Sequence, residues 1–220
     1  MNVEPTIQQM HHIREIAKSA GIYHAIFPGF GSMLGMVRED NLLAHDDDTD
    51  MCVLSELITK EQEDAFVQGL EDARMFEYRR KVERRTDNDR LLWLSLKSSN
   101  KHGHGIYPGC AKSCIWFFFK WKGFYFHSKG RAWIKKLGPR LKIPQDHEAI
   151  GKGVDERLFR HMIKRKFCGK EYMFPALYGT ILDRWYGDWK VPRGGSSREE
   201  MVIIVKKWKD QSTWKLLRRG

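Results

Sequence analysis

The sequence is poor in cysteine and proline and has no long hydrophobic run. It contains four cysteines and seven prolines in 220 residues. Without a secretory signal, this cysteine content indicates free thiols rather than a disulfide framework. The longest apolar run, around 115–119, is far shorter than the roughly 18 residues that cross a bilayer, and the first residues lack the basic and apolar segments of a secretory signal. We therefore expect a cytoplasmic protein, at most peripheral to a membrane.

Positive charge is in excess over the whole chain. There are 39 Lys and Arg residues against 28 Asp and Glu, giving a formal net charge of +11. Hydrophobic residues make up 41% and aromatic residues 12% of the sequence, a composition that excludes wholesale disorder. A chain of this length can bury well over half of its unfolded surface. We expect one compact, basic, aromatic-rich domain.

Helices and strands are predicted in mixed order. The capping-box patterns Thr6-x-x-Gln9 and Thr59-x-x-Gln62 predict helices over 6–20 and 59–73, and 31–37 reads as a tight glycine turn that opens a short helix. Further helices are expected at 155–167, 175–186 and 197–209. Strands are expected at 22–27, 49–54, 77–82, 90–96, 114–120 and 124–128, the last two joined as a hairpin.

The element order fits an α+β domain with one mixed β-sheet flanked by helices. No period of 20–50 residues recurs, which excludes solenoids and propellers. We expect a catalytic domain over 1–192 and a basic helical tail over 193–220. The tail has eight Lys and Arg residues against three acids, a net charge of +5. It could dock on the domain through its apolar residues or lie on an anionic membrane surface.

A cluster of acidic residues stands out in this basic chain. Asp46-Asp47-Asp48-Thr49-Asp50 places four carboxylates in five positions, directly before the apolar run 51–54. In a strand, Asp48 and Asp50 project from the same face. Such a pair is tolerated when it is solvated or when a divalent cation such as Mg²⁺ or Mn²⁺ neutralises it. An acidic surface loop is the alternative interpretation.

A possible phosphate cradle precedes the acidic cluster. Gly31-Ser32 opens a short helix, whose first backbone N–H groups could bind a phosphate. A phosphate-binding turn close to a metal site is typical of enzymes that act on nucleotide diphosphates, because the reaction requires charge neutralisation and alignment.

Two motifs resemble those of the LicD/fukutin family, which has the nucleotidyltransferase fold. Residues 31–38 read G-S-M-L-G-M-V-R and 46–50 read D-D-D-T-D, similar to the family's G-[ST]-x-L-G-x-x-R followed by D-D-D-x-D. Residues 186–192 read Y-G-D-W-K-V-P, similar to its closing Y-G-D-[YW]-x-x-P. The resemblance spans roughly residues 7–192.

The resemblance implies a metal-dependent transferase that moves a phosphoalcohol, such as phosphocholine or ribitol phosphate, from a CDP-linked donor to a glycan hydroxyl. It assigns Asp48 and Asp50 to the metal and catalysis, with Arg38 helping to hold the site. Gly31 and Ser32 would bind the donor phosphates. Asp46 and Asp47 would orient the loop before the metal ligands rather than bind the metal. His104, His127 and Asp188 are further candidates for supporting roles at the site.

One expected feature of the family is missing. Its members usually carry a further carboxylate on a later strand, whereas 113–118 reads S-C-I-W-F-F and has none. Either another residue serves, such as His104, Asp87 or Asp89, or the chemistry does not need it. A glycosyltransferase that uses a UDP- or GDP-linked sugar through the same D-x-D site would tolerate the loss, so sugar transfer remains an alternative.

Three further interpretations concern zinc, His127 and nucleic acid. His102, His104, Cys110 and Cys114 include zinc-ligand types, but their spacing is not that of a standard site, so we do not expect structural zinc. His127 could reach the acidic cluster or be a structural histidine. A nucleic-acid-binding protein would also have a pI near 9.5, yet none of the usual binding motifs is present, so we expect no nucleic-acid partner.

Overall fold

We describe a computed structural model of the whole chain. The structure describes residues 2–44, 46, 48–75, 81–84, 89–96, 107, 109–121, 123–127 and 154–192. Asp47, Asp87, His102, His104 and the predicted tail with its helix at 197–209 lie outside these residues. None of the described helices is long and apolar enough to span a membrane.

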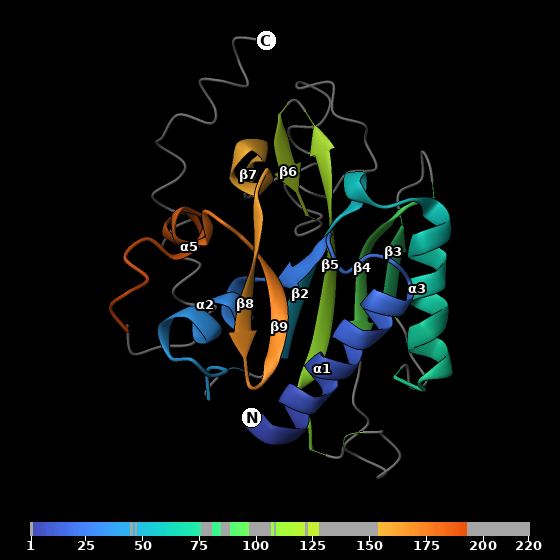
Figure 1. Cartoon of the computed structure of the whole chain (residues 1–220), viewed down its shortest axis with the longest axis horizontal. Coiled ribbons are helices and arrows are strands. Elements are labelled where there is room, and N and C mark those ends of the chain that lie inside the picture. Colours follow the sequence, from blue (N-terminus) through green and yellow to red (C-terminus); the bar gives the residue numbers. More distant parts are fainter. Residues whose placement is uncertain are drawn as a thin grey trace.

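A mixed β-sheet forms the centre of the domain (Figure 1). Its strands run in the order β1-β2-β5-β4-β3, and β6 and β7 extend it from β5. The pair β2–β5 is parallel and the other pairs are antiparallel. The strands are β1 (Ile26–Pro28), β2 (Asp48–Leu54), β3 (Lys81–Arg84), β4 (Leu91–Leu96), β5 (Lys112–Trp121), β6 (Phe124–Phe126) and β7 (Val154–Asp155). This confirms the predicted α+β class.

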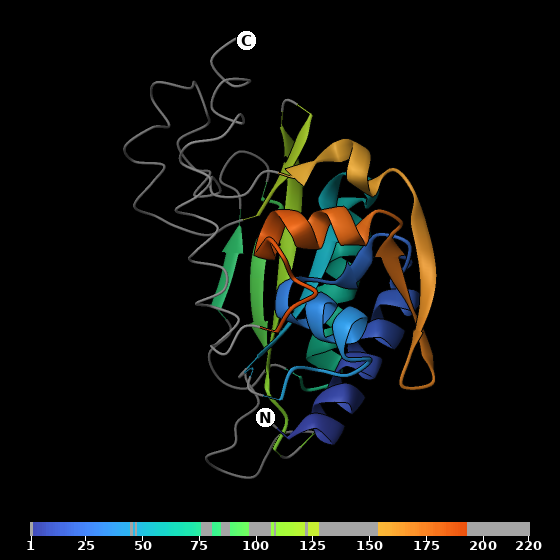
Figure 2. The ribbon, with the colours of Figure 1, turned by 90° about the vertical axis from the view of Figure 1, so that its left-hand side faces the viewer.

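The two faces of the sheet are covered by different helices. Thr49 and Ser113 point to the face covered by α1 (Val3–Ser19), where Ser113 Oγ donates to Gln9 Oε1 at 2.9 Å. Helix α3 (Lys60–Asp72) lies beside α1 (Figure 1). On the other face, α2 (Phe30–Arg38) lies beside α5 (Tyr178–Tyr186) (Figure 2). Because side chains alternate along a strand, Asp48 and Asp50 face α2.

The predicted helix at 155–167 is wrong. Only a short 3-10 turn, Glu156–Phe159, is helical there, and it is followed by β8 (Met162–Phe167), which pairs with β9 (Lys170–Pro175). The two strands are joined by Cys168 and Gly169, which have φ values of 43° and 78°. Positive φ at both loop residues is the geometry of a type I′ hairpin, so this turn overrides the helical spacing of the sequence.

The remaining predicted elements agree with the structure to differing degrees. The capping box at Thr59 and Gln62 is present. The first helix, in contrast, begins at Val3, three residues before Thr6, because Thr6 is inside the helix and donates its hydroxyl to the Asn2 carbonyl. The first strand starts at Ile26, after turns at 23–25, rather than at 22. Pro175 is the last residue of β9. The helix predicted at 175–186 therefore begins only at Tyr178.

A single hydrophobic core joins both sides of the sheet. It also contains a paired carboxylate, Glu63 of α3, whose side chain is 0% exposed. Glu63 Oε2 accepts from Arg90 Nε at 2.9 Å and its Oε1 accepts from the Leu91 N–H at 3.0 Å. Both carboxylate oxygens therefore have donors, which a buried charge requires.

Candidate active site

The parallel pairing of β2 with β5 brings three potential ligands together. The register places Asp48 opposite Lys112 and Asp50 opposite Cys114. One oxygen of each Asp carboxylate and Cys114 Sγ all lie within 4.8 Å of one another. Asp48 is partly buried, and Cys114 is 1% exposed. The predicted carboxylate pair is thus held on a rigid strand, with a thiol as its neighbour.

Helix α2 begins directly beside Asp50. Strand β1 ends at Pro28, and the chain then leaves the sheet to start α2. The Gly29 N–H donates to the Asp50 carbonyl at 2.9 Å, and the Asp50 N–H donates to Ser32 Oγ at 2.9 Å. These two hydrogen bonds join the start of α2 to the backbone of Asp50. They therefore fix the position of the helix relative to the carboxylates.

The first turn of α2 presents backbone N–H groups near the acidic pair. The first hydrogen bond of the helix runs from the Met33 N–H to the Gly29 carbonyl. The N–H groups of Gly31 and Ser32 come before it, and Gly29 has no side chain to cap them. Such a helix start is suited to a phosphate group.

The close approach of α2 to β2 depends on Gly29. A Cβ atom at this position would overlap Sγ of Cys52, on β2. Only glycine lets the helix start this near to the strand without moving the thiol.

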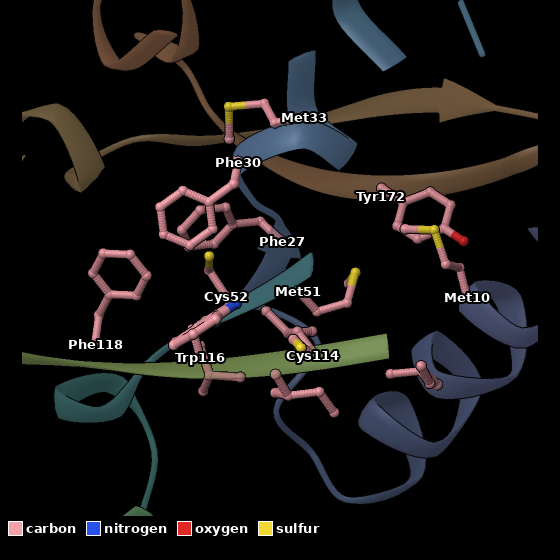
Figure 3. Packing of buried hydrophobic residues seen from close by; sticks show 14 of the residues in the cluster. Met10, Phe27, Phe30, Met33, Met51, Cys52, Cys114, Trp116, Phe118 and Tyr172 are labelled. Carbon is pink, nitrogen blue, oxygen red and sulfur yellow. The ribbon is translucent and has the colours of Figure 1, made fainter. Parts of the chain in front are cut away.

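Aromatic side chains lie beside Asp50 on the α2 side. Trp116 Nε1 donates to Asp50 Oδ1 at 2.6 Å. The Phe30 ring packs edge-on to Trp116, with centroids 6.0 Å apart, and reaches from the start of α2 toward Cys52 (Figure 3). Phe30 has a φ of 43°, a conformation that costs about 1–3 kcal/mol and is maintained by the surrounding packing. Trp116 thus holds Asp50 Oδ1 in one orientation, and Phe30 packs against the ring that does so.

Burial dominates the electrostatics of the two thiols in this region. Desolvation, with help from the charge of Asp50, raises the pKa of Cys114 to about 11, and Lys112 partly opposes the shift. Desolvation also raises the pKa of Cys52, again with a contribution from Asp50. Both are therefore neutral thiols at pH 7 as long as no cation is bound.

His127 lies in the aromatic cluster beside this site. It is 7% exposed, and its ring centroid is 4.9 Å from Phe30, 5.2 Å from Phe118 and 5.5 Å from Trp116. This environment gives it a packing role next to the ring that binds Asp50.

Other predicted residues occupy different places. Arg38, at the far end of α2, pairs with Glu39 at 2.9 Å and donates to the Trp189 carbonyl at 3.3 Å. It therefore joins α2 to the segment after α5. Asp188 is exposed in that segment. Asp46 is partly buried just before β2. Of the four candidate zinc ligands, Cys110 and Cys114 are described, and Cys114 belongs to the group with the two Asp residues.

The donor set fits a divalent cation. Two carboxylates on one face of a strand provide hard oxygen ligands. The Cys114 thiol provides a third group, whose sulfur lies within 4.8 Å of an oxygen of each carboxylate. Sequence reasoning identified both Asp residues but missed Cys114, Trp116 and Gly29 as parts of the site. Cys114 and Trp116 reach the site through the parallel register of β5 against β2. No local sequence pattern predicts that register.

A mixed sheet that carries an Asp pair on a central strand, with a glycine-started helix beside it, defines a nucleotidyltransferase-like domain. The model for the nucleotidyltransferase domain of LicD/FKTN/FKRP matches residues 25–176, more than half of the chain, and the chain belongs to that family. The matched range runs from β1 to β9, so the motif at 186–192 lies beyond it. No curated protein matches the chain.

Proposed function

We propose that this protein moves a phosphoalcohol, of the phosphocholine or ribitol phosphate type, from a nucleotide diphosphate donor to a glycan hydroxyl. Membership of the family supports a glycan-modifying phosphotransferase in general terms. The observation that carries the proposal is the position of Asp48 and Asp50 beside the N-terminal turn of α2. A diphosphate needs both features, because its charge must be neutralised and its orientation fixed.

Each group has a defined part in this reaction. Asp48 and Asp50 would hold Mg²⁺ or Mn²⁺, which when bound offsets the charge on the donor phosphates. The N–H groups of Gly31 and Ser32 would hold a phosphate oxygen. The acceptor hydroxyl oxygen attacks the outer phosphorus, the bridging P–O bond breaks, the nucleoside monophosphate leaves, and the hydroxyl proton passes to solvent. Trp116 would keep Asp50 oriented toward the cation.

Sugar transfer is the second candidate, and one observation favours it. The side chain on β5 beside Asp50 is the thiol of Cys114, not a carboxylate. A transferase that needs only a metal-bound diphosphate, and no additional carboxylate, can function with this arrangement. Under this alternative a UDP- or GDP-linked sugar is the donor, and the bond that breaks is the one from the sugar carbon to the phosphate oxygen.

A donor panel distinguishes the two reactions. CDP-, UDP- and GDP-linked donors would be tested by thermal shift with and without Mn²⁺, and then incubated with glycan acceptors for mass analysis of the product. We expect a metal-dependent shift with a CDP-linked phosphoalcohol and an added phosphoalcohol mass. An added sugar mass would replace the first proposal by the second. Tight binding to random DNA, without any metal-dependent shift from a nucleotide diphosphate, would overturn both.

A further inference from the structure

Cys114 distinguishes this site from one built of oxygen ligands alone. Its Cα lies directly opposite that of Asp50 in the parallel pair β2–β5. Its Sγ belongs to the same group of ligand atoms as the two carboxylates, all within 4.8 Å of one another. Both strands are central in the sheet, so the thiol is held on as rigid an element as the carboxylates are.

The Cys114 sulfur is buried beside the carboxylates and does not face solvent. Cys114 is 1% exposed, whereas Cys168, in the β8–β9 turn, is an exposed thiol. On the same face of β5, Lys112 lies opposite Asp48, and Trp116 donates to Asp50. The side chain between these two residues on that face is that of Cys114. A cation held by both carboxylates would therefore have the sulfur as its next neighbour.

We infer that Cys114 is a third metal ligand and that it makes the site prefer thiophilic divalent cations, such as Zn²⁺ or Cd²⁺, over Mg²⁺. This inference rests on the proposed function and deepens it. Mg²⁺ selects oxygen ligands, whereas thiolate sulfur favours softer ions. On binding, the thiol proton passes to solvent and a metal–sulfur bond forms. Cys114 acts here as a specificity-determining residue for the metal.

Cys52 provides a matched control for Cys114. It is a second buried thiol, 0% exposed, on the same face of the neighbouring strand β2, two residues after Asp50. Its sulfur lies against Gly29 at the start of α2, outside the group of metal-ligand atoms. A general effect of removing a buried thiol would be the same for both cysteines, whereas a ligand effect is specific to Cys114.

Ultraviolet absorption on titration with Cd²⁺ tests the inference, because a cadmium–thiolate bond has a charge-transfer band. The full chain would carry Cys168→Ser, which removes the exposed thiol. We expect a band that saturates at one equivalent of Cd²⁺, is lost in Cys114→Ser and persists in Cys52→Ser. No band in the parent, or an undiminished band in Cys114→Ser, would overturn the inference.

A second variant keeps the test decisive if Cys114→Ser folds poorly. Cys114→Asp replaces the sulfur by an oxygen ligand, so we expect it to lose the cadmium band and to bind Mg²⁺ roughly tenfold more tightly than the parent. An unchanged preference between Mg²⁺ and Cd²⁺ in Cys114→Asp would count against the inference. If Mn²⁺ binds in an Asp50-dependent manner but Cd²⁺ gives no band, the inference fails and the proposed function stands. If no divalent cation binds, both fail.

Discussion

Among the described residues, Glu63 in one region and the pair Asp48 and Asp50 in another are held in different ways. In the first region, Glu63 of α3 is paired with Arg90, and its second oxygen accepts from the backbone of Leu91. Arg90 in turn donates to the Ser55 and Ile58 carbonyls at 2.8 and 3.2 Å. These bonds link α3, β4 and the segment after β2 and hold their geometry.

In the second region, Asp48 and Asp50 lie close together beside the thiol of Cys114, with Lys112 opposite Asp48. Their ligand atoms are close enough to share one cation, and the ring nitrogen of Trp116 fixes one oxygen of Asp50. Two carboxylates this close repel each other, whereas the charges of Glu63 and Arg90 attract. The comparison indicates that Glu63 links neighbouring elements of the fold, and we propose that the Asp pair is arranged for a ligand.

The largest expected effect is on activity at the Asp pair. Asp48→Asn or Asp50→Asn should lower kcat/KM by about a thousandfold, roughly 4 kcal/mol of transition-state stabilisation, because the cation loses a charged ligand. The free energy of unfolding should change little, since Asn has the same size and keeps a side-chain oxygen as hydrogen-bond acceptor. Product formation and urea denaturation measure the two quantities. Asp64→Asn, at an exposed ion pair with Lys60, is the control; loss of stability without loss of activity at Asp50 would reverse the comparison.

The second effect is on stability at Glu63. Glu63→Ala leaves Arg90 without its carboxylate and the Leu91 N–H without its acceptor, so the free energy of unfolding should fall by about 3 kcal/mol. Glu63→Gln keeps an oxygen for Leu91 and should lose less. Urea denaturation of both variants, with the metal affinity of the folded protein as second readout, checks this. An unchanged urea midpoint for Glu63→Ala would refute the structural role.

A third effect separates the position of α2 from the charge of the site. Gly29→Ala changes no charge, but its methyl group would overlap Cys52 Sγ. Such overpacking costs about 1–3 kcal/mol and moves the proposed phosphate cradle away from Asp50, so donor affinity should fall as well. Adding Cys52→Ala removes the sulfur and should restore both quantities. If stability and donor affinity stay low in the double variant, the close approach of α2 to β2 is not the reason for glycine at position 29.

The smallest effect concerns a titratable group far from the acidic pair, on α1. His11 Nε2 is 3.2 Å from the Cys168 carbonyl, which can only accept, so the ring is protonated at Nε2 and Nδ1 accepts from the Tyr172 hydroxyl at 2.7 Å. Burial, the largest cause, lowers the pKa of His11 below 6.5. The unfolded chain then binds the proton more readily, so stability is full above pH 6.5 and declines as pH falls through the window down to the lowered folded pKa.

Denaturant midpoints of wild type and His11→Gln across that window isolate the His11 contribution from those of the other histidines. The wild-type midpoint should fall more than that of the variant as the solution is acidified. Parallel curves for the two proteins would contradict the assignment of this titration to His11.

Local sequence patterns predicted the elements that depend on neighbouring residues. The strand predicted at 49–54 and observed at 48–54, its Asp pair and the helix capped by Thr59 all follow from spacing within a few residues. The hairpin of β8 and β9 was missed because Cys168-Gly169 is not a common type I′ pair, and the basic residues before it also fit a helix. The position of Cys114 beside Asp50 depends on a register between residues 64 positions apart, set by packing of the whole sheet.

The central claim is that Asp48 and Asp50 bind a divalent cation together with the diphosphate of a nucleotide donor. Calorimetric titration of CDP into the full chain, with and without Mn²⁺, tests it most directly, with Asp50→Asn run in parallel. We predict binding of one CDP that requires Mn²⁺ in the wild type and is absent in the variant. Metal-independent binding of CDP that is equal in both proteins would contradict the account.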